Sequence, residues 1–380
     1  MFENELETLY IQGIRRQIRD RQSGQGRLIS LGNDYLLNLA SNDYLGFANE
    51  EKIINAAIDA LRKHGAGAGS SRLLSGGTVL HAELEETAAR LKGTESAVVF
   101  NSGYSANTGA IPVLAGEKDA IFSDELNHAS IIDGCRLSRA KKYIYRHCDI
   151  SDLRKKVRCS DADRRIVVTD ALFSMDGDIA PLRDIYDVCR ETSAVLYIDD
   201  AHGTGVLGNG RGTLVHYGLE PSDFVIQMCT LSKSFGSYGA FVAADKGTVD
   251  YLINRSRSLI FSTALPPAVI ASAKAAIELI MSDHGRADLL NSNVNKFHKG
   301  LEAIRVNKAN SSTQIIPLLF ESVDAASDLS AFLEMHKIYA PVIKPPTVKQ
   351  PRTRISLTAM HTGDDIDMLL GVLSDYFGKK

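Results

Sequence analysis

Apolar residues recur along this chain with two different spacings, and segments of the two kinds alternate. Residues 51–65 and 81–93 repeat apolar positions every three or four residues, which is typical of amphipathic helices. Short apolar runs between such segments indicate buried strands, namely 96–100, 119–123, 165–170, 194–200 and 224–229. Strands that alternate with helices predict an α/β fold with a mostly parallel sheet covered on both faces.

The pattern changes towards the end of the chain. A long helical stretch from about 266 to 280 is followed by a predicted strand at 314–320, a helix at 324–338 and a strand at 352–359. Residues 1–20 alternate acids and bases with spaced apolar residues, which predicts an amphipathic helix and not an export signal. We therefore expect three parts: a helical arm at 1–44, a large domain at 45–282 and a small α/β domain at 283–380.

Composition narrows the classes of protein that remain. A net charge of -3 with 23% charged residues shows no bias towards nucleic acid. No apolar run is long enough to cross a membrane. The chain has five scattered cysteines and no C-x-x-C pair: Cys135, Cys148, Cys159, Cys189 and Cys229. We therefore expect no disulfide framework and no metal site. A reduced, cytoplasmic setting fits this pattern best.

Polar residues that follow the predicted strands are the candidates for chemistry, because ligands of such sheets bind beyond the carboxyl ends of strands. Gly103 and Tyr104 open a predicted helix, where their backbone donors could bind an anion, although taken alone the motif is better explained by a glycine turn with Ser and Asn capping the helix. Asp199 and Asp200 end a buried strand two residues before His202, and buried paired carboxylates predict a partner for at least one of them.

Two further residues stand out after strands. Lys233 lies among small and hydroxylated residues in TLSKSFGSYGA, where a cofactor could reach the amine and Thr230 could bind a phosphate, although a solvated lysine is the commoner case. His128 precedes a predicted helix, where a cap or a surface group is the ordinary interpretation. Their combination is more informative than either residue alone.

A G-x-G-x-x-G spacing at Gly203, Gly205 and Gly208 invites a dinucleotide-binding interpretation. The motif does not fit its usual context, because DDAH separates the strand from the first glycine and GNGRG follows where a helix should begin. We therefore reject a nicotinamide-dependent oxidoreductase, which would also leave Lys233 without a role.

Seven motifs taken in order resemble the α-oxoamine synthases, a branch of the fold type I pyridoxal-phosphate (PLP) enzymes: SNDYLG, GSSRLLSGG, NHASIIDG, FSMDGDIAPL, DDAHGTGVLG, TLSKSFG and KPPTV. The similarity covers nearly the whole chain. It implies a large domain with a mostly parallel seven-stranded sheet, a small C-terminal α/β domain and an N-terminal arm. It also implies a homodimer with shared active sites.

The resemblance assigns a role to each matching position. Lys233 would hold PLP as a Schiff base, Asp199 would pair with the pyridine nitrogen, and His128 would stack on the ring and act on the substrate. Ser174 and His202 would hydrogen-bond the ring hydroxyl. Contacts to the phosphate or the ring are implied for Gly103, Tyr104 and Thr230. Thr263 would reach the phosphate bound by the neighbouring subunit. His202 joins Lys233, Asp199 and His128 as a catalytic residue.

The activity implied is a decarboxylative condensation of an amino acid with an acyl thioester. AHGTGVLG and PPTV resemble most the branch that joins L-alanine to pimeloyl-CoA or a pimeloyl carrier protein in biotin biosynthesis. The nearest alternative joins glycine to acetyl-CoA, and a PLP-binding regulator without catalysis is a further one. Both alternatives keep the same cofactor residues.

The substrate residues depart from the family at one position. The family's arginine before PPTV, which binds the amino acid's carboxylate, is Lys344 here, and lysine lacks the flat bidentate fork of arginine. Arg352 and Arg354 are candidates to compensate, and Thr347 belongs to the same motif. Arg15, with Arg16 nearly as good a match, aligns with the arginine that meets the acyl substrate.

Overall fold

A computed structural model describes residues 1–378 and separates into two compact units. We call Phe47–Phe173 with Ile179–Ala287 the sheet unit, and Met1–Gly46 with Ser174–Asp178 and the residues from Asp288 onward the terminal unit. The three-part division expected from the sequence stays a prediction. No helix in the described part of the chain has the length and apolar character that crossing a membrane requires.

The sheet unit is built on seven strands in the order β3-β9-β8-β7-β6-β4-β5, with only β9 antiparallel to its neighbours. This confirms the predicted α/β class and the mostly parallel sheet. The strand bounds are β3 Ser96–Phe100, β4 Ala120–Asp124, β5 Lys141–Tyr145, β6 Arg165–Asp170, β7 Val195–Asp199, β8 Val225–Thr230 and β9 Ala240–Ala244.

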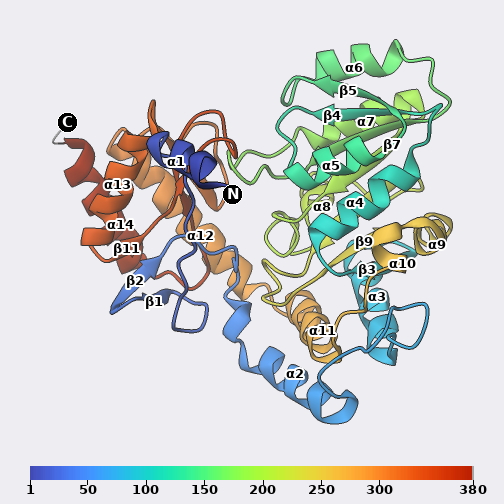
Figure 1. Ribbon diagram of the computed structural model, residues 1–380, viewed down its shortest axis with the longest axis horizontal. Coiled ribbons are helices and arrows are strands. Elements are labelled where there is room, and N and C mark those ends of the chain that lie inside the picture. Colours follow the sequence, from blue (N-terminus) through green and yellow to red (C-terminus); the bar gives the residue numbers. More distant parts are fainter. Residues whose placement is uncertain (379–380) are drawn as a thin grey trace. The chain divides into compact units, whose positions relative to one another are not determined.

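Helices cover both faces of this sheet (Figure 1). Alternate strand side chains pack on one face against α4, α5, α9 and α10, and on the other against α6, α7 and α8. Such double coverage explains why the strands read as continuous apolar runs. The bounds are α4 Gly103–Leu114, α5 Ala129–Leu137, α6 Ile150–Arg158, α7 Leu182–Thr192, α8 Thr213–His216, α9 Lys246–Arg255 and α10 Arg257–Ile260.

The rest of the sheet unit is helical. α2 (Glu51–His64), α3 (Val79–Lys92) and α11 (Pro267–Ser282) pack together, and the short 3₁₀ turn Phe47–Asn49 precedes α2. Thr78 and His81 form a capping box at the start of α3. Gly93 ends that helix in the left-handed region at φ 69°, where glycine is favoured. These local signals place Lys92 at the last position of α3.

The terminal unit contains two small sheets and four helices. One sheet has the order β1-β2-β11 and the other β10-β13-β12. Their bounds are β1 Leu28–Leu31, β2 Asp34–Asn38, β11 Ile338–Tyr339, β10 Ile315–Leu319, β13 Arg352–Ser356 and β12 Val342–Ile343. The helices are α1 Glu3–Ile11, α12 Gly285–Ala303, α13 Val323–Met335 and α14 Gly363–Gly378.

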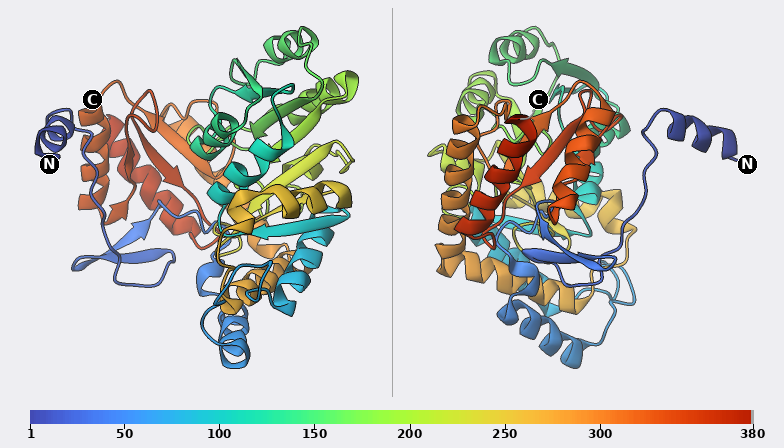
Figure 2. Two further views of the ribbon diagram at one scale, coloured as in Figure 1. Left: turned by 45° about the vertical axis from the view of Figure 1, so that its right-hand side comes forward. Right: turned by 90° about the vertical axis from the view of Figure 1, so that its left-hand side faces the viewer.

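The prediction of one helix over residues 1–20 was wrong in its length. Only Glu3–Ile11 is helical, and no residue of this helix is buried. Both views of Figure 2 show α1 standing apart from the other helices of its unit. Without a surface to pack on, the apolar stripe of 12–20 lacks the burial that stabilises a short helix.

Candidate active site at the carboxyl edge of the sheet

The carboxyl ends of β3, β4, β6, β7 and β8 meet at one edge of the sheet, because these strands are mutually parallel. A cavity of about 220 Å³ lies there, entirely within the sheet unit. Its lining contains seven of the predicted site residues together with six others: Gly103, Tyr104, His128, Asp199, His202, Thr230 and Lys233, with Ser102, Ser130, Asp170, Ala201, Met228 and Ser232. Residues up to 131 positions apart in sequence therefore form one site.

Asp199, the last residue of β7, is 4% exposed and has neutral hydrogen-bond partners. Its carboxylate accepts from Asn107 Nδ2 at 2.8 Å and from the Ala201 backbone N–H at 3.1 Å. Burial raises the pKa of Asp199 above its ordinary value, and the nearby positive charge of Lys233 opposes that rise. A buried carboxylate of this kind is suited to binding a cationic group in the cavity.

Asp200 has the opposite environment. Its side chain forms a fully buried ion pair with Lys92 at 3.0 Å and accepts further hydrogen bonds from Thr204 and Thr213. The sequence predicted that at least one of the two adjacent carboxylates has a partner, and Asp200 is the one. Its partner is Lys92, which the sequence did not indicate.

Lys233 follows β8 and is half-buried, with its Nζ 2.9 Å from His202 Nε2. His202 is 5% exposed and follows β7. An amine held by a ring nitrogen in a partly dry cavity is a suitable nucleophile or base. The structure thus brings together the two residues that the sequence placed after different strands.

His128 caps α5 and also lines the cavity, so both interpretations of this residue hold. Its Nδ1 accepts from the Ser130 backbone N–H at 3.2 Å and lies 2.7 Å from Ser130 Oγ. Although the residue as a whole is exposed, loss of water around the ring lowers the pKa of His128; the charge of Lys233 adds to this, while that of Asp199 opposes it. These surroundings favour the neutral imidazole over the charged one.

The N-terminus of α4 opens into the cavity. Ser102 caps the helix and satisfies the N–H of Ser105. The N–H groups of Gly103 and Tyr104, the first two of the helix, have no acceptor among residues 1–378. A side-chain carbon at Gly103 would lie 2.5 Å from Thr230 Cγ2, so glycine is required there for close packing. This end of the cavity fits an anion.

The donor set fits PLP. Two free helix N–H groups and the Thr230 hydroxyl suit a phosphate, Asp199 suits a protonated pyridine nitrogen, and the Lys233 amine suits an aldehyde. The cavity joins these groups in the sheet unit alone. The side chain of Tyr104 does not add to the set by its hydroxyl, which donates to Asp133.

The other predicted site residues lie outside this cavity. Ser174, Arg15, Lys344 and Thr347 belong to the terminal unit. Thr263 is exposed in the sheet unit, where its carbonyl accepts from Asn101 Nδ2 at 2.8 Å. Their predicted roles stay predictions.

Two residues at the site were missed by the sequence, one that lines the cavity and one that lies behind it. Asn107 is buried on α4 and joins Asp199 to Ser130 Oγ and Tyr197. Asp170 ends β6, and its carboxylate accepts the His128 backbone N–H at 2.6 Å. A strand-end aspartate in RIVVTD was a visible signal, whereas nothing in NSGYSANTG distinguishes Asn107 from an ordinary helical residue.

Metal-ligating side chains gather at one further place in the described residues, namely Asp124, His147 and Cys148. The Asp124 oxygens accept from the backbone N–H groups of Leu126 and Cys148, and one lies 3.0 Å from His147 Nδ1. We interpret this group as the closure of the loops after β4 and β5, because the carboxylate is already used by both.

Comparisons with known proteins agree with this geometry. Residues 34–373 match the model of the aminotransferase class I and II family. The chain is 52% identical to a provisionally named 8-amino-7-oxononanoate synthase of Thermodesulfovibrio yellowstonii, over 98% of this chain and 97% of that one. It is 46% identical to the 8-amino-7-oxononanoate synthase of Geobacter metallireducens, over 98% and 96%.

A solved serine palmitoyltransferase from S. paucimobilis, with a bound PLP–myriocin aldimine, is also similar. It has a TM-score of 0.92 and 29% identity, over 98% of this chain and 96% of the other. These findings confirm the resemblance to the α-oxoamine synthases and the type I fold that the motifs implied.

Proposed function

Because this chain belongs to the aminotransferase class I and II family, we propose that it is a PLP-dependent acyltransferase of biotin biosynthesis, an 8-amino-7-oxononanoate synthase. The reaction joins L-alanine to pimeloyl-CoA or a pimeloyl carrier protein and releases the carrier thiol and CO₂. The observation that carries the proposal is the meeting of Asp199, Lys233 and the α4 N-terminus in one cavity.

PLP would be held by residues of the sheet unit. The N–H groups of Gly103 and Tyr104 and the Thr230 hydroxyl would bind its phosphate, Lys233 its aldehyde carbon and Asp199 its pyridine nitrogen. When bound, PLP accepts electrons from the α-carbon of the amino acid. His128 would lie against the ring.

The protein's own groups move the protons. Asp199 would keep a proton on the ring nitrogen of the bound cofactor, and Asn107 holds the carboxylate in place at 2.8 Å. The Lys233 amine would take the α-proton of the amino acid, and His202 Nε2, 2.9 Å away, would keep that amine in position. His128 donates to the oxyanion that develops when the thioester carbonyl is attacked.

Arg354 would bind the carboxylate of the amino acid substrate in this proposal. Lys344 Nζ donates to the carbonyls of Gly13 and Arg15 at 2.9 and 2.7 Å, and Arg352 pairs with Asp176 at 2.7 Å. Arg354 is 7% exposed. Its two terminal nitrogens donate to the Ser174 carbonyl and to Asn42 Oδ1, each at 3.0 Å, and only its Nε has no acceptor among residues 1–378. A buried guanidinium with an unused donor suits a carboxylate ligand.

The test is thiol release by the purified, PLP-loaded protein. L-alanine with pimeloyl-CoA is run beside glycine with acetyl-CoA, with a pimeloyl carrier protein as a third acyl donor. We expect release with alanine and a pimeloyl donor. Release with glycine and acetyl-CoA alone would move the protein to glycine C-acetyltransferase and leave the cofactor residues in place. Silence with all three pairs would overturn the proposal.

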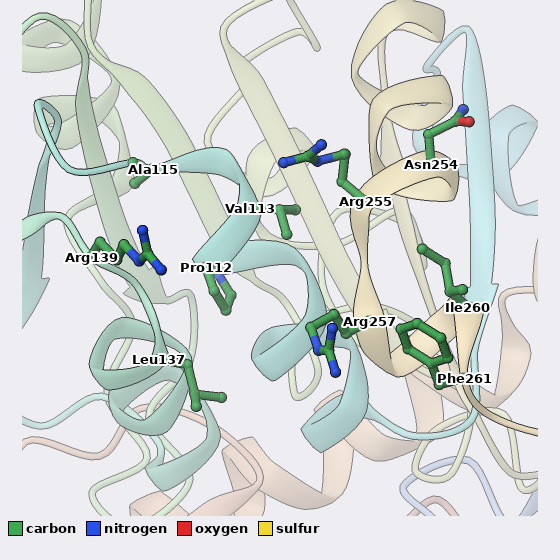
Figure 3. A pocket seen from close by; sticks show the side chains of 11 residues that line it. Pro112, Val113, Ala115, Leu137, Arg139, Asn254, Arg255, Arg257, Ile260 and Phe261 are labelled. Carbon is green, nitrogen blue, oxygen red and sulfur yellow. The ribbon is translucent and has the colours of Figure 1, made fainter.

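We also propose that the active form is a cytoplasmic homodimer. Leu74 and Phe261 are 81% and 71% exposed on segments joined by the Ser71–Thr263 bridge. Figure 3 shows Phe261 beside Arg257 and Ile260, with Leu137 and Arg139 on the opposite side of a cavity of about 510 Å³. Apolar exposure of this kind is typical of an interface. Light scattering should give about twice the chain's 41.3 kDa, and Leu74→Asp should lower it.

A further inference from the structure

The glycine-rich loop after β7 surrounds a buried ion pair that has no part in the cavity. Lys92, at the end of α3, is 1% exposed and Asp200 is likewise 1% exposed. Lys92 Nζ donates three hydrogen bonds, to Asp200 at 3.0 Å, to Thr204 Oγ1 at 3.1 Å and to the Arg211 carbonyl at 2.6 Å. All three protons of the ammonium are therefore used.

Asp200 is satisfied from the other side of the same loop. It accepts from Thr204 Oγ1 at 2.8 Å, from the Thr213 backbone N–H at 3.0 Å and from Thr213 Oγ1 at 2.6 Å. The pair thus contacts residues at both ends of the loop 201–213. Burying two charges costs free energy that attraction alone does not offset, so complete hydrogen bonding of this kind is required to hold them.

The glycines of this loop make room for the pair. A Cβ at Gly212, where φ is 101°, would lie 1.9 Å from Asp200 Oδ2 and 2.6 Å from Lys92 Nζ. A Cβ at Gly203 would lie 2.3 Å from Asp200 Oδ1. Of the three glycines in the dinucleotide-like spacing, only Gly203 makes room for the ion pair. A Cβ at Gly205 would lie 2.5 Å from Ser234 Cβ, and one at Gly208 would lie 2.4 Å from the Gly212 carbonyl oxygen.

We propose that Lys92 and Asp200 are positioning residues that fix the loop 201–213 and thereby set where His202 meets Lys233. His202 lies two residues after Asp200, and its Nε2 is 2.9 Å from Lys233 Nζ. Neither Lys92 nor Asp200 lines the cavity. The inference rests on the proposed function, because the proposed function makes Lys233 the base that His202 keeps in position.

The test compares the PLP-loaded wild type with Lys92→Met/Asp200→Asn, which removes both charges and leaves none unpaired. Lys274→Met is the matched control. Lys274 of α11 pairs with Glu83, which lies on the same helix α3 as Lys92, but this pair is only partly buried. Two quantities are measured: hydrogen exchange of the amides in 201–213, and the pH midpoint of the cofactor's visible absorption.

We expect exchange in the loop to rise by about tenfold in the double variant, with β6 and β8 unchanged, because the loop loses the contacts at its ends. The absorption midpoint should move by about one pH unit as His202 shifts from Lys233. The control should match the wild type in both.

A double variant with wild-type loop exchange and midpoint would overturn the proposal, even if its melting temperature falls, since the pair would then be only structural. If the double variant does not fold, Thr213→Val carries the same comparison, because it removes the hydroxyl that donates to Asp200 and leaves the ion pair with Lys92 in place. Failure of the proposed function is separate: it would appear as absence of thiol release from the wild type, with loop exchange unaffected.

Discussion

The two carboxylates that end β7 are one peptide bond apart and have opposite surroundings. Asp200 is neutralised by Lys92 and held by two threonines, whereas Asp199 has an amide and a backbone N–H as partners and lines a cavity. Since successive strand side chains point to opposite faces, one strand end serves both purposes. A charge satisfied by its own chain is structural here, and a charge left with neutral partners is available for a ligand.

The terminal unit repeats this contrast with cations. Arg352 donates to Asp176 and to the Met175 carbonyl, while the Nε of Arg354, two positions along the same strand, has no acceptor among the described residues. Charge content alone does not separate the two arginines. Their hydrogen-bond partners do, and the comparison can be tested residue by residue.

Removal of the amine on the cavity side should have the largest effect. Lys233→Ala is expected to lower turnover by about 10⁴-fold or more, because the group that binds the cofactor and moves the α-proton is lost. Thiol release and the visible absorption of the cofactor are measured together. Retained turnover in a variant that melts like the wild type would remove Lys233 from the mechanism.

Exchange of the two carboxylates for amides should separate chemistry from stability. Asp199→Asn is expected to lower turnover by about 10²–10³-fold while PLP still binds, because the ring nitrogen is no longer held protonated. Asp200→Asn should instead lower the free energy of unfolding by about 3–5 kcal/mol, because it leaves Lys92 buried and unpaired. Both variants are compared by α-proton exchange of L-alanine and by thermal melting. If the two variants lost exchange and melting temperature to the same extent, the distinction between a chemical Asp199 and a structural Asp200 would be wrong.

A smaller effect is expected at the arginines. Arg354→Lys should raise KM for L-alanine by about 10–100-fold, because lysine lacks the unused Nε donor and cannot keep the contacts of the guanidinium to Ser174 and Asn42. Lys344→Met is the matched control and should stay within about threefold, since its exposed contacts to backbone carbonyls contribute little. Steady-state kinetics at fixed acyl donor measures both, and the reverse order would return the carboxylate grip to Lys344.

The smallest effect is a pH dependence in the cofactor-free protein. Burial raises the pKa of Asp199 in the folded state, so the folded state binds this proton more tightly than the unfolded chain. The stability that Asp199 contributes is therefore full below its unfolded pKa near 3.8 and is lost as pH rises through the folded value. Urea unfolding of wild type and Asp199→Asn from pH 4 to 8 should show the difference falling with pH; a rising difference would contradict the sign.

The sequence by itself determined the fold class, most elements and the core of the site. Long periodic segments and buried strands are local signals, so 96–100, 165–170 and 194–200 were found near their true bounds. Strand-end residues such as Asp199, His202 and Lys233 were found because parallel strands bring their carboxyl ends to one edge. The glycine spacing after β7 was correctly separated from a nucleotide motif.

Tertiary structure alone decided which neighbours each charge meets. Lys92 is 108 positions from Asp200, and Asn107 is 92 positions from Asp199, so no local pattern pairs them. The helix predicted over 1–20 ended at Ile11 because its apolar stripe has no surface to cover. Side-chain type and spacing follow from the chain itself, whereas burial and pairing depend on contacts between distant segments, and these determine whether a carboxylate is structural or chemical.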